Sequence, residues 1–143
     1  MKKIFMLFAM AAGLVSCGNK EMDGPAVNVQ STSDRVEVIY FYGKQRCVTC
    51  MAIETNTKEV LESEFANKLK DGSVVFKTVD TSTADGEKIA DMYEVTWSSL
   101  FVNKWEGGNE HRNNMTEFGF SNARHNPDGF QKGLSEKIHQ LLK

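Results

Sequence analysis

Two cysteines separated by two residues, Cys47 and Cys50, are the side chains of this sequence whose spacing most directly suggests chemistry. Residues three positions apart lie on one turn of a helix, so their sulfurs can meet there. A thiolate at such a pair attacks a disulfide, and the second thiol then resolves the mixed disulfide that forms. The same pair is also compatible with a permanent structural disulfide, or with two of the ligands of a metal site.

The residues around the pair predict the elements that position it. Residues 36–42 are rich in β-branched and aromatic side chains, as expected of a central strand, and Gly43 ends this run. From about residue 47 to residue 69, apolar side chains recur at helical spacing. The pair therefore lies where a buried strand is followed by a helix, whose first N–H groups and positive dipole end stabilise a thiolate.

The rest of the pattern predicts one mixed α/β domain. Gly107 and Gly108 provide a turn at which the chain can reverse. The expected order is strand, helix, strand, helix, strand, strand, helix, which predicts a three-layer α/β/α architecture with a mixed sheet, parallel first and antiparallel last. The later elements are expected at residues 74–79 (strand), 84–93 (helix), 100–102 (strand), 116–120 (its antiparallel partner) and 128–143 (helix).

With Cys47-Val48-Thr49-Cys50 at its strand-to-helix turn, the chain from about residue 36 to residue 143 resembles the thioredoxin superfamily, which has this element order. The resemblance implies a thioredoxin-like domain over residues 35–143 and a thiol–disulfide oxidoreductase that needs no cofactor. It implies that Cys47 is the nucleophile and that Cys50, one turn deeper and buried, is the resolving thiol. Arg46 and Lys44 are expected to lower the pKa of the Cys47 thiol, because nearby cations stabilise a thiolate.

The sequence departs from the family pattern at three positions around the pair. Thioredoxins carry a tryptophan directly before the first cysteine, where this chain has Arg46, and a buried acid six residues before it, where this chain has Phe41. Ser99 stands at the position of the family's cis-proline. A non-proline cis bond costs about 3 kcal/mol, so a trans bond is expected here. We expect Trp97, Ser98 and Ser99 to form the loop that faces substrate, with Trp97 either covering the sulfurs or occupying a core position.

The first residues predict an export signal. Lys2 and Lys3 precede an apolar run over residues 4–15 that is too short to span a bilayer comfortably. Residues 1–16 are therefore expected to be a secretory signal peptide. The alternative, a buried N-terminal helix, would require a polar face that this run lacks.

The end of that run resembles the lipobox of bacterial lipoproteins, Leu14-Val15-Ser16-Cys17. The resemblance implies a lipid on Cys17 and a protein that is anchored to a membrane without crossing it. Residues 17–34 are expected to be a flexible spacer, in which residues 27–29 can add an edge strand. Gly18 after the cysteine favours the outer membrane, so we expect a lipid-anchored protein of the cell envelope that faces the periplasm.

Assigning Cys17 to lipid leaves two thiols, and the expected partners are thiols or disulfides of exported proteins, or a redox partner protein. The net charge of −2 gives no sign of a nucleic-acid surface. Two alternatives remain: a binding module with a permanent disulfide, and a metal site completed by His111 or His125. Residues 105–124 exceed a minimal hairpin and form either a partner-recognition loop or a solvated hairpin with a wide turn.

Overall fold

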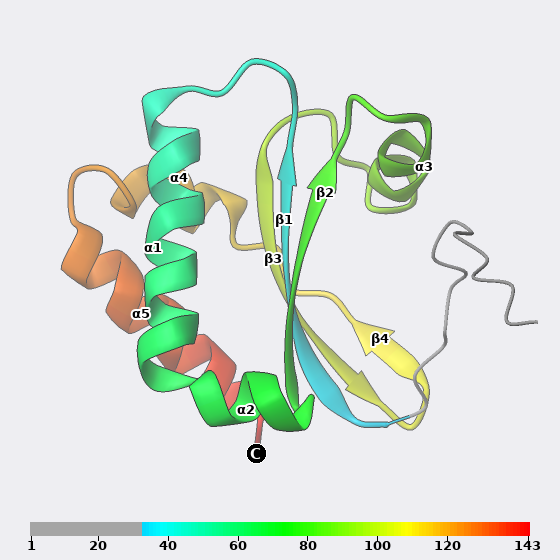
Figure 1. Cartoon of the computed structure of the whole chain (residues 1–143), viewed down its shortest axis with the longest axis vertical. Coiled ribbons are helices and arrows are strands. Elements are labelled where there is room, and N and C mark those ends of the chain that lie inside the picture. The colour runs from blue at the N-terminus through cyan, green and yellow to red at the C-terminus, as the bar shows by residue number, and fades with distance from the viewer. Residues whose placement is uncertain (1–32) are drawn as a thin grey trace, which may run out of the picture.

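The computed structural model describes residues 33–143, in which helices cover both faces of a four-stranded sheet (Figure 1). The strand order is β2-β1-β3-β4. β1 (Arg35–Tyr42) runs parallel to β2 (Val74–Asp80), whereas β3 (Ser99–Glu106) runs antiparallel to β1 and β4 (Asn109–His111) antiparallel to β3. The predicted three-layer α/β/α architecture with a mixed sheet is confirmed.

Alternate residues of β1 pack into two separate hydrophobic layers, because successive side chains of a strand point to opposite faces. Tyr40 belongs to the larger core, which α1 (Val48–Glu64) and α5 (Pro127–Leu141) cover. Phe41 belongs to the smaller core on the other face, under α3 (Ala84–Met92). The central strand is therefore buried on both sides, as its composition predicts, and it ends beside the cysteine pair.

The single helix expected over residues 47–69 is divided in two, so that prediction is wrong in its extent. α1 ends at Glu64, and α2 (Ala66–Asp71) follows after Phe65, whose backbone leaves helical geometry at φ −117° and ψ 16°. The Phe65 side chain is fully buried in the larger core, whereas α2 buries none of its own residues. The free energy gained by burying the Phe65 ring is greater than the free energy lost where the regular helix is interrupted.

The strand expected over residues 116–120 is also wrong, because this segment lies in α4 (Thr116–Asn122). The partner of β3 is instead β4, which follows directly after a tight turn at Gly107 and Gly108. Residues 105–124 are thus neither a long recognition loop nor a hairpin with a wide turn. The Asn114 side chain accepts the N–H of Thr116 at 2.9 Å and so satisfies a free donor at the start of α4.

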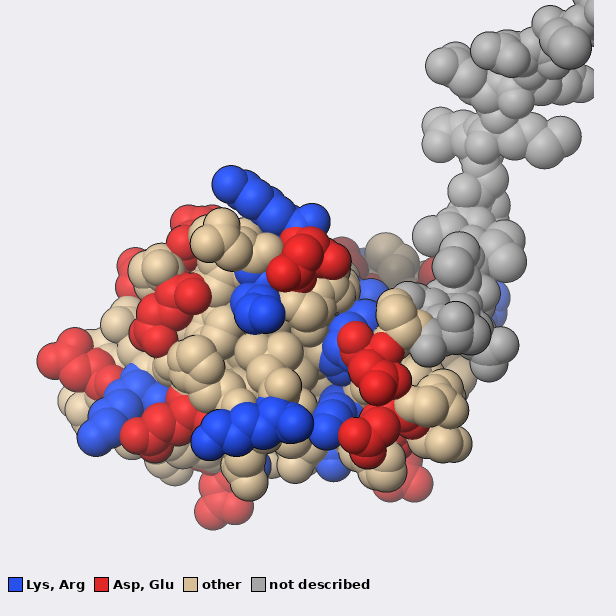
Figure 2. Space-filling model, turned by 90° about the horizontal axis from the view of Figure 1, so that it is seen from below, with Lys and Arg blue, Asp and Glu red and all other residues tan. Residues whose placement is uncertain are grey.

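The central strand β1 carries one buried carboxylate, that of Glu37. Glu37 of β1 is 2% exposed and accepts hydrogen bonds from Arg35 at 2.6 Å and from Lys77 at 2.8 Å. Burial by itself raises the pKa of Glu37, but the hydrogen bonds from Lys77 and Arg35 outweigh burial and hold this pKa below its usual value. On the surface, by contrast, acidic and basic side chains are interspersed at the end of the molecule seen in Figure 2.

The expected signal peptide (residues 1–16), Cys17 and the edge-strand segment at residues 27–29 lie outside the described residues, as does most of the expected spacer. Within residues 33–143, no helix combines the length and the apolar character needed to cross a membrane.

Candidate functional site

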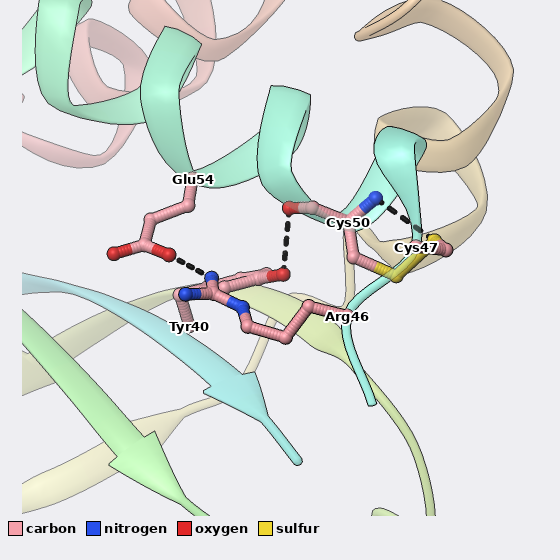
Figure 3. Close-up of a disulfide and its surroundings, with 5 residues drawn as sticks. All are labelled: Tyr40, Arg46, Cys47, Cys50 and Glu54. Carbon is pink, nitrogen blue, oxygen red and sulfur yellow. Dashed lines mark hydrogen bonds and ion pairs between the residues drawn. A yellow bond between two sulfur atoms is a disulfide. The ribbon is translucent and has the colours of Figure 1, made fainter. Parts of the chain in front are cut away.

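Cys47 and Cys50 form a disulfide at the start of α1 (Figure 3). Their Cα atoms lie 5.0 Å apart. Cys47 is the N-cap residue of the helix, and its sulfur accepts the backbone N–H of Cys50 at 3.0 Å. An N–H group that already points at the Cys47 sulfur also stabilises the thiolate that forms there when the disulfide opens.

The two cysteines differ in their access to solvent. Cys47 is exposed, whereas Cys50 is 6% exposed and belongs to the buried residues of α1. An incoming thiolate therefore reaches the Cys47 sulfur first. The expected burial of Cys50 is confirmed, whereas the roles of attacking and resolving thiol stay predictions.

A tyrosine on the central strand holds the first turn of α1. Tyr40 is fully buried, and its hydroxyl donates a hydrogen bond to the carbonyl oxygen of Cys50 at 2.7 Å (Figure 3). The sequence analysis missed this role, because an aromatic residue in a buried strand gives no sign of what its hydroxyl contacts. The bond ties the buried cysteine directly to the sheet.

Arg46 extends away from the disulfide (Figure 3). Its guanidinium group forms an ion pair with Glu54 and lies over the Tyr42 ring, 4.8 Å from the ring centroid. Glu54 also pairs with Lys58 at 2.6 Å. Arg46 thus lies next to Cys47 in the chain, but its charge is paired with the Glu54 carboxylate. That Arg46 lowers the pKa of the Cys47 thiol stays a prediction.

Lys44 is exposed in the loop between β1 and α1. Hydrogen bonds from Ser82 hold the pKa of Asp80 below its usual value, and the charges of Lys44 and Arg46 lower it further. Both cations therefore act on the carboxylate at the end of β2. The expected effect of Lys44 on the Cys47 thiol also stays a prediction.

The loop before β3 lines the same pocket as the cysteine pair, and it contains both exposed and buried residues. Trp97 is 70% exposed, so the alternative that placed it in the core is wrong. Its ring stacks on Phe120 of α4 at a centroid distance of 6.2 Å. Ser98 and Ser99 are buried, and the Ser99 hydroxyl donates to the Trp97 carbonyl at 3.2 Å. No cis peptide bond occurs among residues 33–143, as expected for Ser99.

An open pocket of about 680 Å³ contains the disulfide. It brings Arg46, Trp97 and Ser98 together with both cysteines, but its walls do not include Lys44 or Ser99. Its remaining walls are formed by Gly43, Gln45, Thr81, Thr96 and Phe120. Phe120 was missed because its segment was predicted to be a strand.

Three large apolar side chains near the cysteine pair are exposed to solvent. Four large hydrophobic side chains are exposed in the described part of the chain, and three of them are Val48, Met51 and Trp97. Val48 and Met51 belong to the first turn of α1, and Trp97 lines the disulfide pocket. Val48 directly follows Cys47, and Met51 directly follows Cys50, so these apolar side chains flank the disulfide.

The structure bears on two further points from the sequence: the residue at the position of the family's buried acid, and the alternative of a metal site. Phe41, at the position of the family's buried acid, is fully buried and packs on Tyr93 and Phe101 at centroid distances of 5.2 and 5.8 Å. Within residues 33–143, no group of three or more His, Cys, Asp or Glu residues is placed to hold a metal ion. The proposed completion of a metal site by His111 or His125 therefore finds no support in this part of the chain.

No protein-family model and no curated protein matches this sequence. Among solved structures, the solution structure of a thioredoxin from Thermus thermophilus matches with a TM-score of 0.48 and 18% identity, over 74% of this chain and 72% of that chain. The crystal structure of thioredoxin f2 from Chlamydomonas reinhardtii matches with a TM-score of 0.43 and 13% identity, over 68% of this chain and 85% of that chain. Matches at this level carry no conclusion about function.

The fold class follows from the chain's own topology. Parallel β1 and β2, antiparallel β3 and β4, helices on both faces and a Cys-x-x-Cys pair between β1 and α1 together define a thioredoxin-like α/β fold. A disulfide at this turn, with one exposed sulfur, supports a redox-type function.

Proposed function

We propose that this protein is a thiol–disulfide oxidoreductase, tethered to a membrane by lipid on Cys17, that acts on exported proteins or on a redox partner protein. The observation that carries the proposal is the disulfide between exposed Cys47 and buried Cys50 at the N-terminus of α1, inside an open pocket. The apolar side chains of Val48, Met51 and Trp97 around it suit contact with a polypeptide.

The reaction is an exchange of sulfur–sulfur bonds. When the pair oxidises a substrate, a substrate thiolate attacks the Cys47 sulfur, the Cys47–Cys50 bond breaks, and Cys50 leaves as a thiolate. A second substrate thiolate then attacks the substrate sulfur of the mixed disulfide, and Cys47 leaves as a thiolate. Two electrons pass from substrate to protein. In the opposite direction, the Cys47 thiolate attacks a substrate disulfide, and Cys50 displaces the substrate.

Trapping the mixed disulfide tests this proposal. In the full-length chain, Cys50→Ala removes the resolving thiol, so Cys47 is expected to accumulate mixed disulfides with other exported proteins. These are detected as reductant-sensitive adducts on non-reducing gels. The matched control is Cys47→Ala, which keeps the buried thiol and is expected to capture far less. If Cys50→Ala captures nothing and the wild type neither oxidises nor reduces a model dithiol peptide, the proposal is wrong.

The second candidate is a binding module with a permanent disulfide. The observation that favours it is Phe41, whose buried ring occupies the position of the acid that exchanges protons with the buried thiol in thioredoxins. The two candidates differ in the stability of the disulfide. Structural disulfides of exported proteins have reduction potentials below about −300 mV, and catalytic pairs lie higher.

A further inference from the structure

A second pocket of about 670 Å³ lies directly beside the disulfide pocket. Trp97 and Phe120 line both pockets, so their stacked rings form a shared wall. The disulfide lies on one side of this wall. The other side is lined by side chains from the end of α3, the loop before β3 and α4, and these have no part in the exchange reaction.

The second pocket combines two carboxylates with aromatic rings. Glu94 and Glu117 are both exposed and both line it. In the described part of the chain, neither side chain forms an ion pair or a hydrogen bond. No lysine or arginine is among the residues that line this pocket. A cation placed there is attracted by the negative charges of both carboxylates, and the exposed face of Trp97 adds a cation–π contact.

One described cation, Arg112, contacts a residue that lines this pocket, and it is already paired. The Arg112 guanidinium lies 3.8 Å from the centroid of the Tyr93 ring, and its Nε donates to Glu110 at 2.8 Å. Arg112 also donates to the Met92 carbonyl at 2.6 Å, which fixes its position. Its charge is thus balanced by Glu110, and the excess negative charge of the pocket remains.

We propose that this pocket binds a lysine or arginine side chain of the polypeptide whose cysteine reacts at Cys47. The inference rests on the proposed function, and it assigns Glu94 and Glu117 as the residues that select the substrate. A polypeptide that places its cysteine in the disulfide pocket passes the shared wall of Trp97 and Phe120. A cationic side chain a few residues from that cysteine then reaches the two carboxylates, and its aliphatic stem packs on the aromatic rings.

Matched peptides test the selection directly. Each peptide carries one cysteine as a chromogenic mixed disulfide and differs only in having lysine, norleucine or glutamate at one of several positions near the cysteine. The second-order rate constant with the reduced wild type is measured by stopped-flow absorbance. The lysine peptide is expected to react about fivefold faster than the norleucine peptide at the best position, with the glutamate peptide slowest.

Two double variants separate the pocket from general charge. Glu94→Gln combined with Glu117→Gln is expected to bring the lysine-to-glutamate rate ratio close to one. Glu62→Gln combined with Glu87→Gln makes the same change of net charge at exposed positions outside the pocket, and it is expected to keep the ratio of the wild type. Equal loss of the ratio in both double variants would overturn the inference.

The neutral reagent hydroxyethyl disulfide distinguishes failure of the inference from failure of the proposed function. If the wild type reacts with this reagent but treats all three peptides alike, the selection is wrong and the exchange activity stands. If the wild type does not react with it at all, the proposed function fails. The pocket is then tested by NMR on the oxidised protein with cysteine-free peptides. Lysine-dependent shifts of the Trp97 indole N–H that the Glu94→Gln, Glu117→Gln variant loses would support the pocket, and their absence would overturn it.

Discussion

Cys47 and Cys50 occupy one helical turn but have different surroundings. Cys47 is exposed and caps α1 with its own sulfur, whereas Cys50 is buried and its carbonyl accepts the Tyr40 hydroxyl. Cys47 is thus open to solvent, and the buried Cys50 is held against the sheet. The precision of the site therefore depends on Tyr40 as well as on the cysteines.

Tyr40→Phe is expected to lower the free energy of unfolding of the oxidised protein by about 1 kcal/mol, because it removes one buried hydrogen bond and little volume. Urea unfolding measures this change. The matched control is Tyr42→Phe, since the described part of the chain gives the Tyr42 hydroxyl no hydrogen bond. An equal effect of the two changes would show that the bond from Tyr40 to Cys50 contributes nothing.

At the scale of elements, α3 depends on a close approach to the end of β2. Thr83 caps this helix by accepting the N–H of Gly86 at 3.1 Å. A Cβ atom on Gly86 would lie 1.9 Å from the carbonyl oxygen of Asp80, which is backbone and cannot rotate away. Packing therefore requires glycine at this position. α3 in turn covers the smaller core, to which Phe41 belongs.

Gly86→Ala is expected to destabilise the protein by roughly 2–3 kcal/mol, the upper part of the range for overpacking, although alanine ordinarily favours a helix over glycine by about 1 kcal/mol. Thermal or urea unfolding gives the measurement. Glu87→Ala, an exposed change in the same helix, is the control and is expected to stay within about 0.5 kcal/mol of the wild type. A stabilised Gly86→Ala variant would contradict the close approach.

The sheet gives a prediction about pH. The pKa of Glu37 is lower in the folded protein than in the unfolded chain, so the folded state is stabilised by Glu37 above the unfolded pKa, near 4.5. This contribution is lost as the pH falls through the folded pKa. Urea unfolding between pH 7 and pH 3 is expected to show a shallower acid loss in Glu37→Gln than in the wild type. Identical slopes in the two proteins would contradict this assignment.

The elements also show what local pattern can and cannot predict. The central strand, α3, α5 and the mixed sheet follow from composition and spacing, because their apolar side chains recur at the positions that pack into the two cores. The start of α1 follows from the place of the cysteine pair after Gly43, where the strand ends. Residues 116–120 looked like a strand because Phe118 and Phe120 alternate with small or polar residues. The structure forms a helix there, which places the Phe118 ring on Phe130 at 5.7 Å, close to Gly133. The secondary structure of residues 116–120 therefore depends on a contact between α4 and α5. A pattern read over a few neighbouring residues cannot include that contact.

The candidate site divides in the same way. The cysteine pair, Trp97 and Ser98 were predicted from their positions in the chain, and the structure places them in one pocket. Phe120 comes from a different element and could be found only with the helix. One signal was present: Asn114 followed three residues later by Glu117 is typical of a helix start.

At the scale of the whole molecule, the central strand separates the start of the described chain from the disulfide. β1 begins at Arg35 and runs toward the loop that leads to Cys47 (Figure 1). The Cα atoms of the first and last of its eight residues are separated by seven intervals, or roughly 23 Å at about 3.3 Å per interval. A protein anchored through residues before β1 would therefore hold its disulfide at the far end of this strand, open to partners.

Cys17→Ser is expected to move the protein from the membrane fraction to the soluble fraction, because it removes the proposed site of lipid attachment. Fractionation of bacteria that export the full-length chain measures this, and thiol labelling shows whether the Cys47–Cys50 disulfide is unchanged. The opposite control, Cys47→Ser, is expected to stay with the membrane. If the wild type is found in the soluble fraction, the lipid anchor is wrong.

The reduction potential of the Cys47–Cys50 disulfide tests the central claim most directly. Wild-type protein is equilibrated in dithiothreitol buffers of graded potential, quenched with acid and labelled on its free thiols for mass spectrometry. An exchange-active pair is expected to have a potential above about −300 mV. A potential clearly below that value would show a permanent structural disulfide and would contradict the assignment of Cys47 as an attacking thiol.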